Sequence, residues 1–337
     1  MKKSYHYTQV TNKIKALPVL VLLFFASCTK YEDGFLSPYF QYPSSDYTIA
    51  KGRAFTSDAI NPDGSSIPFK VKLSHAYDEN GNIVDELFTK TYPVTIWTSS
   101  YNTATDTTVE LLNAKRKVEQ LPAIAINENN GAIESNTASV NLPSGAYTLD
   151  LEISNAVGTQ VLKKVVTIHV EEADPYESSP GLSATSEGLI QVGNESASIG
   201  LGALPVMSVE KTADEPWIIN VKMVDKNGFA FNPAAGEIVK RPATGLNPVP
   251  PFLQNLQYYT NSYEATSDQM KFPYAVVPMP LQSLGNGYNM YYRIPTKYVH
   301  IDNYPDDAYT CNVRFALRIW VPGSYNITVK VPNITHR

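Results

Sequence analysis

Residues 142–170, LPSGAYTLDLEISNAVGTQVLKKVVTIHV, decide the fold class of this chain. Within them, Thr148–Ser154 (TLDLEIS) and Val161–Val170 (VLKKVVTIHV) alternate polar and apolar residues, with the period of two that a half-buried strand requires. Asn155 and Gly158, which lie between the two runs, are residues that favour turns. The stretch therefore predicts two antiparallel strands, the second of them long.

The start of this stretch carries Pro143, Gly145 and Tyr147 in a Pro-x-Gly-x-Tyr arrangement. With the turn and the long last strand, it resembles the end of cadherin-like and other immunoglobulin-like bacterial surface modules. The resemblance extends over residues 124–170 and implies a sandwich fold. It transfers no catalytic residue, because such modules serve unrelated binding and spacer roles. Calcium is the ligand that it suggests, but the dense carboxylate sets of calcium-binding cadherins are missing here, so turn chemistry is the favoured interpretation.

Shorter runs upstream have the same period of two. Phe69–Ala76 (FKVKLSHA) and Val94–Thr98 (VTIWT) alternate in polarity. Ile124-Ala125-Ile126 and residues 132–135 flank Asn130-Gly131, a pair that tolerates positive φ and predicts a hairpin. We expect these runs to form the remaining strands of a first domain.

One helix is predicted between Val109 and Leu121, because four apolar residues can share a helix face: Val109, Leu112, Val118 and Leu121. Pro122 ends it, because proline cannot continue the backbone hydrogen bonding of a helix. Lys115, Arg116 and Lys117 lie beside the apolar positions. A solvated helix face is the favoured interpretation of this cluster, with an anion site as the alternative.

Further strands are predicted toward the C-terminus. Residues 171–186 (EEADPYESSPGLSATS) have the composition of a linker. Beyond them, Trp217–Val224 (WIINVKMV) reads as a buried strand, and two alternating runs are joined by Pro322-Gly323-Ser324 near the end of the chain. With 22 Tyr among 337 residues and only 18% charged residues, the composition suits pleated, half-buried surfaces. We predict a mainly β chain with two tandem β-sandwich domains, residues 46–174 (immunoglobulin-like) and 188–337, joined by a linker at 175–187.

The N-terminus predicts where the protein resides. Lysines precede an apolar run, Leu17–Ala26, that is too short to span a bilayer, and small residues come directly before Cys28. This pattern resembles a bacterial lipoprotein signal, which implies a signal peptide at residues 1–27, lipidation of Cys28, and a membrane anchor and tether at 28–45. Lys30, Glu32 and Asp33 resemble the export tag of Bacteroidota lipoproteins, which implies the outer face of the outer membrane. The alternative is an ordinary secretory signal with an incidental Cys.

Charge and cysteine content exclude some classes of protein. The net charge of −5 and the scattered Lys and Arg residues give no basic footprint, so we expect no nucleic-acid partner. Lipidation of Cys28 would leave Cys311 without a partner, which excludes a disulfide within the chain. Cys311 lies in an alternating run and is predicted to be a buried structural thiol.

Support for catalysis is weak. The His and Cys residues have no metal-ligand spacing, Asp225-x-Asn227-Gly228 lacks the other ligands of a calcium loop, and neither a serine-hydrolase nor a phosphate-loop motif is present. We predict no catalytic residue, no metal site and no cofactor. A glycoside hydrolase needs only two suitably separated acids, so five loop acids stay open as candidates, although solvated surface acids are the favoured interpretation. They are Glu264, Asp268, Asp302, Asp306 and Asp307.

Binding has better physical grounds, because the region after residue 250 is rich in Tyr. A Tyr ring can stack on the apolar face of a sugar, while neighbouring polar groups orient it through hydrogen bonds. For any single Tyr, packing in the core is the alternative interpretation. The predicted ligand-binding residues are Tyr258, Tyr259, Tyr263, Tyr288, Tyr291 and Tyr292, with Asn286, Asn289 and Arg293 as polar partners.

As a whole, the chain resembles the accessory surface lipoproteins of Bacteroidota that are associated with starch-utilisation-type transporters. The lipidation site, the acidic export tag, the immunoglobulin-like first module and the C-terminal β domain carry the resemblance. It implies capture or presentation of a glycan or other nutrient at the cell surface, with an outer-membrane transporter complex as a partner. A structural or spacer lipoprotein with only protein partners is the main alternative, and a glycoside hydrolase is the third.

Overall fold

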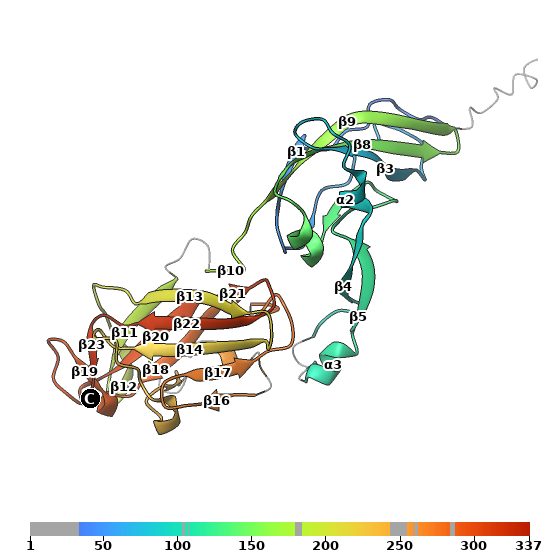
Figure 1. Ribbon diagram of the computed structural model, residues 1–337. Coiled ribbons are helices and arrows are strands. Elements are labelled where there is room, and N and C mark those ends of the chain that lie inside the picture. The colour runs from blue at the N-terminus through green and yellow to red at the C-terminus, as the bar shows by residue number, and fades with distance from the viewer. Residues whose placement is uncertain are drawn as a thin grey trace, which may run out of the picture.

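The computed structural model describes residues 34–102, 105–106, 108–178, 184–242, 255–258, 260, 262–283 and 287–337. The predicted signal peptide and Cys28 lie outside these residues. The chain is mainly β and forms β-sandwiches, as predicted, with two hydrophobic clusters. One cluster draws its buried residues from positions 40–170 and the other from positions 189–334. Figure 1 shows the two corresponding units, the first at upper right and the second at lower left.

The first unit packs a four-stranded sheet against a three-stranded one. The four-stranded sheet has the order β1 (Asp46–Ala50), β9 (Gly158–Glu171), β8 (Gly145–Asn155) and β3 (Lys70–Tyr77). The three-stranded sheet has the order β2 (Phe55–Thr56), β7 (Ile133–Ser135) and β6 (Ile124–Ile126). A short helix, α2 (Asp85–Thr89), and a 3-10 turn, η1 (Thr137–Asn141), complete the unit. The β8–β9 and β6–β7 hairpins confirm the corresponding sequence predictions.

Part of the predicted tether packs onto this unit. Phe40 and Tyr42 are buried in its core, and the Tyr42 hydroxyl donates to the carbonyl oxygen of Gly131 at 2.5 Å. The Ser37 backbone nitrogen donates to Ser65 Oγ at 2.8 Å. The segment that precedes β1 is therefore held against the sandwich from residue 37 onward.

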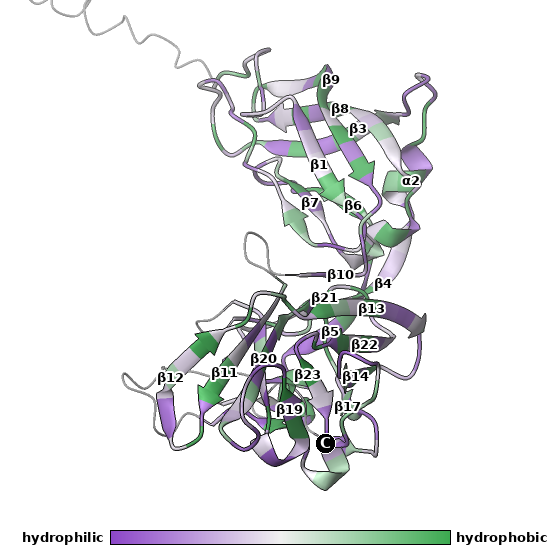
Figure 2. Ribbon diagram, turned by 90° about the vertical axis from the view of Figure 1, so that its left-hand side faces the viewer, coloured by the Kyte–Doolittle hydropathy of each residue, from purple (hydrophilic) through white to green (hydrophobic). Residues whose placement is uncertain are grey.

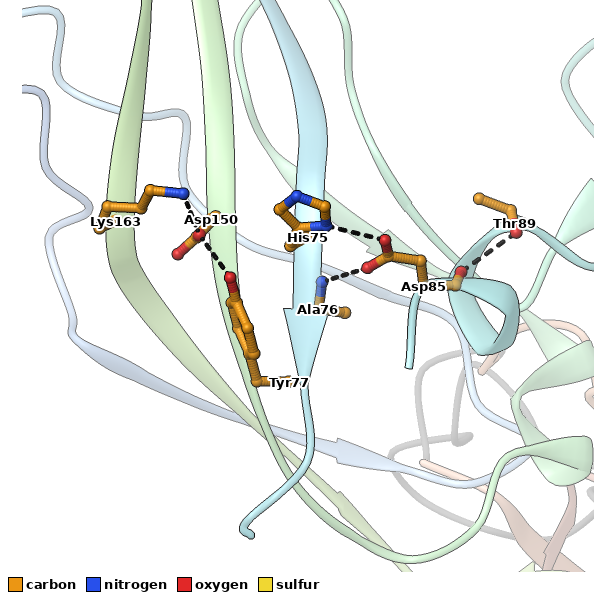
Figure 3. A network of polar contacts seen from close by, with 7 residues as sticks. All are labelled: His75, Ala76, Tyr77, Asp85, Thr89, Asp150 and Lys163. Atoms are coloured by element: carbon orange, nitrogen blue, oxygen red, sulfur yellow. Dashed lines mark hydrogen bonds and ion pairs between the residues drawn. The ribbon is translucent and has the colours of Figure 1, made fainter. Parts of the chain in front are cut away.

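A buried carboxylate lies at the centre of the four-stranded sheet (Figure 3). Asp150 of β8 faces register shifts in both neighbouring strands, β3 and β9. Its Oδ2 accepts hydrogen bonds from Tyr77 Oη at 3.0 Å and Lys163 Nζ at 2.8 Å, and its Oδ1 accepts from the Lys164 backbone nitrogen at 2.7 Å. Lys164 has a φ of 51°, which is uncommon for a residue with a side chain. Asp150 thus stabilises the irregular part of both strand pairs.

A two-stranded arm leaves the first unit and reaches the second (Figures 1 and 2). It consists of β4 (Thr91–Trp97), α3 (Val109–Asn113) and β5 (Arg116–Pro122), and β4 pairs with β5 along its whole length. The predicted helix from Val109 to Leu121 is therefore wrong beyond Asn113. Val118, one of the apolar positions assigned to the helix face, is exposed in a strand. The hydrogen bonds between β4 and β5 favour a strand here more than the helical spacing of apolar residues favours a helix, because β4 offers hydrogen-bonding partners along its whole length.

The second unit packs two five-stranded sheets face to face. The first has the order β12 (Asn194–Gly200), β11 (Thr185–Gln191), β20 (Tyr309–Ala316), β18 (Asn289–Ile294) and β15 (Val239–Lys240). The second has the order β13 (Val206–Ala213), β22 (Ser324–Lys330), β14 (Ile218–Val224), β17 (Met270–Pro273) and β16 (Glu264–Ala265). Short elements are η2 (Pro233–Ala235), η3 (Leu256–Tyr258), η4 (Thr296–Tyr298), and the pair β19 (Val299–Ile301) and β23 (Ile334–His336).

Strand alternation builds the core of the second unit. Met290, Tyr292 and Ile294 of β18 point inward, as do Cys311 and Val313 of β20. Cys311 is fully buried, which confirms its prediction as a structural thiol. Burial raises the pKa of its thiol well above the ordinary value, and the nearby Glu187 carboxyl adds to this. The thiol is therefore held in its unreactive, protonated form.

Several contacts join the two units at their junction. Residues 176–177 (β10), within the predicted linker, pair with β21 (Arg318–Ile319) of the second unit. Two guanidinium groups lie over the Trp320 ring, that of Arg53 at 5.1 Å and that of Arg318 at 4.3 Å from the ring centroid. Arg53 also forms an ion pair with Glu177 at 3.3 Å. Since Arg53 belongs to the first unit, these contacts hold the first unit against the second.

No helix in the described ranges has the length and apolar character needed to cross a membrane.

Candidate functional site

Tyr292, one of the predicted ligand-binding residues, lies in the core. Its ring is 1% exposed and stacks on Phe315 with a centroid distance of 6.0 Å. Its hydroxyl accepts a hydrogen bond from the Leu256 backbone nitrogen at 3.1 Å, and burial raises its pKa above the ordinary value. A ring enclosed in this way has no face left for a ligand, so Tyr292 has the packing role that was the alternative interpretation.

Asn289, Tyr291 and Arg293 alternate with the core residues of β18 and therefore share its opposite face. Asn289 Oδ1 accepts from Arg314 Nη1 at 2.8 Å. Arg293 forms a two-pronged ion pair with Glu195, with nitrogen–oxygen distances of 2.7 and 2.5 Å. The sequence thus identified residues that the structure brings together, although Arg293 is committed to an internal ion pair.

The remaining predicted residues are dispersed. The Tyr288 ring lies beneath the Arg318 guanidinium at 4.5 Å, and Tyr263 stacks on Phe272 of the other sheet at 5.3 Å. Tyr258 ends η3, whereas Tyr259 and Asn286 lie outside the described residues. The predicted Tyr rings are therefore divided between two sheets.

Each of the five loop acids considered for glycoside hydrolysis forms an ion pair. Nitrogen–oxygen distances run from 2.6 to 3.0 Å. A general acid needs a raised pKa, but the His300 hydrogen bond lowers the pKa of Asp306, and the Lys222 hydrogen bond lowers that of Asp268. The pairs are Glu264–Lys271, Asp268–Lys222, Asp302–Lys226, Asp306–His300 and Asp307–Arg337.

A cavity with an exposed aromatic ring lies where the arm meets the second unit. It has a volume of about 640 Å³ and opens to solvent. Trp97, at the end of β4, is 38% exposed there, and the Tyr101 ring lies 6.1 Å from it at a tilt of 48°. We call this hollow the junction cavity; its lining residues are Trp97, Thr98, Ser99, Ser100, Tyr101, Pro278, Leu281 and Gln282.

Arg116 and Asp106 support the aromatic side of the junction cavity. The Arg116 guanidinium lies 5.7 Å from the Trp97 ring centroid and donates to the carbonyl oxygen of Ala275 at 3.4 Å. Asp106 is buried, and its Oδ2 accepts from Lys115 Nζ at 2.8 Å and from the Asn102 backbone nitrogen at 2.6 Å. The Lys115 hydrogen bond contributes most to lowering the pKa of Asp106, so this carboxylate stays charged and fixes the loop after Trp97.

Sequence reasoning missed Trp97 as a binding residue, because VTIWT reads as an ordinary strand. A signal was present in the residues that follow it. Thr98-Ser99-Ser100-Tyr101 places hydroxyls and a second aromatic ring directly after the Trp, a composition suited to a polar, aromatic surface. Pro278, Leu281 and Gln282, from a distant part of the chain, could be joined to this segment only by the tertiary structure.

In the part of the chain that the structure describes, no three His, Cys, Asp or Glu side chains gather closely enough to hold a metal ion.

Residues 60–213 match a family model described as a domain of unknown function (DUF5007). The matched range covers most of the first unit and the whole arm, and it continues through β11, β12 and β13 of the second unit. A search of curated proteins gives no match.

Proposed function

We propose that this chain is a lipid-anchored protein of the outer-membrane surface that captures a glycan in the junction cavity. The observation that supports this most is the pairing of an exposed Trp97 ring with Tyr101 in a cavity that is also lined by hydroxyl and amide groups. The volume of about 640 Å³ lies in the range usual for small-molecule sites.

The chemistry of the lining suits a sugar. The face of an indole ring is negatively polarised and apolar, so it can stack on the C–H groups of a pyranose. Thr98, Ser99 and Ser100 supply hydroxyls that both donate and accept hydrogen bonds, and Gln282 supplies an amide. Arg116 lies over the Trp97 ring and restrains it. This restraint reduces the conformational entropy that the ring loses when a ligand binds.

The first unit acts in this proposal as an immunoglobulin-like module that holds the site away from the membrane. Its β1 strand runs parallel to β9, the last strand, beside the β8–β9 hairpin. The attachment itself rests on the sequence around Cys28, and an outer-membrane transporter complex is the proposed partner that receives the glycan.

A glycan screen tests the proposal. The purified protein is run by affinity electrophoresis in gels that contain amylopectin, xylan, mannan or dextran, and a glycan that retards it is then titrated by calorimetry. We expect retardation by at least one glycan, and loss of that retardation in Trp97→Ala and Tyr101→Ala. Phe229→Ala removes a ring of 66% exposure elsewhere and serves as the control. Normal migration of the wild type in all four gels would overturn glycan capture.

A transporter partner is tested separately, by pull-down of the tagged lipoprotein from detergent-solubilised outer membranes. Recovery of an outer-membrane transporter supports presentation of the ligand for uptake. Recovery of protein partners by a chain that binds no glycan would favour the structural or spacer lipoprotein instead.

A further inference from the structure

The sheet of β12, β11, β20, β18 and β15 has a polar face that points away from the core. Ser186, Arg314 and Tyr291 lie in one row across β11, β20 and β18. The pairing of β15 with β18 places Arg241, the residue after β15, opposite Tyr291. Its guanidinium lies 5.8 Å from the Tyr291 ring centroid. Two arginines thus flank one tyrosine on the same face.

A hollow of about 170 Å³ lies in this face, and we call it the arginine pocket. Gly188 of β11 stands beside Asn312 of β20 and contributes no side chain. A Cβ atom at Gly188 would lie 3.5 Å from Ser198 Oγ, which is an ordinary contact. A larger side chain at this position would therefore extend into the pocket and fill it. At about 30 Å³ for each water, the volume suits a single small group. The lining residues are Ser186, Glu187, Gly188, Ser198, Arg241, Tyr291, Asn312, Val313 and Arg314.

The acidic groups near the arginine pocket are engaged elsewhere. Glu195 is bound by both terminal nitrogens of Arg293, which neutralises that pair. Glu187 accepts hydrogen bonds from Cys311 Sγ at 3.5 Å and Asn333 Nδ2 at 3.0 Å, on the core side of the sheet. Burial raises the pKa of Glu187, which favours its neutral form. Neither carboxyl forms an ion pair with Arg241, and Glu195 acts on its guanidinium only through a longer-range attraction.

Arg241 has no ion pair or hydrogen bond to any residue that the structure describes, and its Nε is buried without a partner. Burial, followed by the charge of Arg293, lowers the pKa of its guanidinium and outweighs the opposing attraction of Tyr291 and Glu195, so the site disfavours an unaccompanied cation. Asn312 is 7% exposed, and its Nδ2 also has no hydrogen-bond partner. Buried donors without acceptors are costly, and an oxyanion would satisfy both.

We propose that the arginine pocket binds the oxyanion of a small ligand, a carboxylate or a sulfate ester, with Arg241 as its principal donor. The planar guanidinium fork matches such a group in a two-pronged geometry, and Tyr291 forms a wall of the site. An acidic sugar, either free or within a glycan, provides this chemistry. The proposal is independent of glycan capture in the junction cavity, because the two sites share no residue.

Calorimetry in a low-chloride buffer tests the arginine pocket, with sodium glucuronate, glucose 6-sulfate and glucose as probes. We expect at least one of the two anions to bind and glucose to give no heat. Arg241→Gln should weaken anion binding by about 10- to 100-fold, because it removes a charge-assisted contact. Gly188→Val should abolish binding by filling the pocket without a change of charge. Lys240→Gln removes an exposed cation one residue away and should bind as the wild type does.

Thermal melting provides the control for folding. Arg241→Gln should retain the wild-type melting temperature, while the anion raises the melting temperature of the wild type and of Lys240→Gln more than that of Arg241→Gln. A comparison of glucuronate with an oligo-glucuronide distinguishes a free acid from a residue within a chain. Equal affinity of Arg241→Gln and Lys240→Gln, or equal binding of glucose and both anions, would overturn the proposal. Trp97→Ala should leave anion binding intact, so the two proposals fail separately.

Discussion

The buried carboxylate of Asp150 gives the sharpest stability prediction. It is 1% exposed and accepts hydrogen bonds from three donors, of which the Lys164 backbone nitrogen cannot turn toward another acceptor (Figure 3 shows the other two). Removing the acceptor of a buried donor costs about 1–3 kcal/mol, and loss of a charged acceptor adds to this. Lys163 is exposed and regains water, so it contributes little. We expect Asp150→Ala to lower the free energy of unfolding by about 2–4 kcal/mol.

Urea denaturation followed by circular dichroism measures this loss, with Glu152→Ala as the matched control on the same face of β8. The pH dependence gives a second readout. Burial alone would raise the pKa of Asp150, but the hydrogen bonds from Lys163, Lys164 and Tyr77 outweigh it and lower the pKa. The stability from this carboxylate is therefore present above the unfolded pKa of about 3.9 and is lost as the pH falls through the lower folded value. A stability of Asp150→Ala equal to that of Glu152→Ala at pH 7 would refute the reasoning.

Three further predictions concern the core, a turn and the anchor. Burial raises the pKa of Glu187, so its contribution to stability is present below about pH 4.3 and is lost as the pH rises through the folded value. The urea midpoint of Glu187→Gln, relative to that of the wild type, should therefore be higher at pH 8 than at pH 4. Gly131→Ala should lower the free energy of unfolding by about 1–3 kcal/mol more than Gly81→Ala in the same assay. Both glycines have positive φ, but only at Gly131 would a Cβ lie 2.6 Å from Ile60. Equal losses for the two variants would contradict this. Cys28→Ala should release the protein from the membrane fraction or stop its maturation, as seen by fractionation and immunoblotting, and unchanged retention at the outer surface would speak against lipidation.

The fold class could be predicted because strand period and turn residues are local signals. The β8–β9 hairpin follows from the alternation on either side of Asn155 and Gly158, and the structure places strands over both runs. The register shifts around Asp150 could not be foreseen, since TLDLEIS alternates regularly and places this Asp among the outward positions. The false helix after Asn113 has the same origin, because the partner strand that overrides its spacing lies elsewhere in the sequence.

The candidate sites were predicted only in part. A density of Tyr residues identified β18, and alternation along that strand then separated Tyr292, in the core, from Tyr291, on the polar face. Arg241 and Arg314 both line the arginine pocket, and only the order of the strands in the sheet brings them to the same face. The junction cavity is lined by residues of the arm and of the second unit, which lie far apart in the sequence, so composition alone could not indicate it.

The central claim is glycan capture in the junction cavity. The most direct test is the dissociation constant of a glycan that retards the protein, measured for the wild type, Trp97→Ala and Phe229→Ala. Loss of a stacking ring is expected to weaken binding by about 10-fold or more, since about 1.4 kcal/mol corresponds to each factor of ten. Phe229→Ala should match the wild type. A dissociation constant for Trp97→Ala equal to that of the wild type would contradict the account.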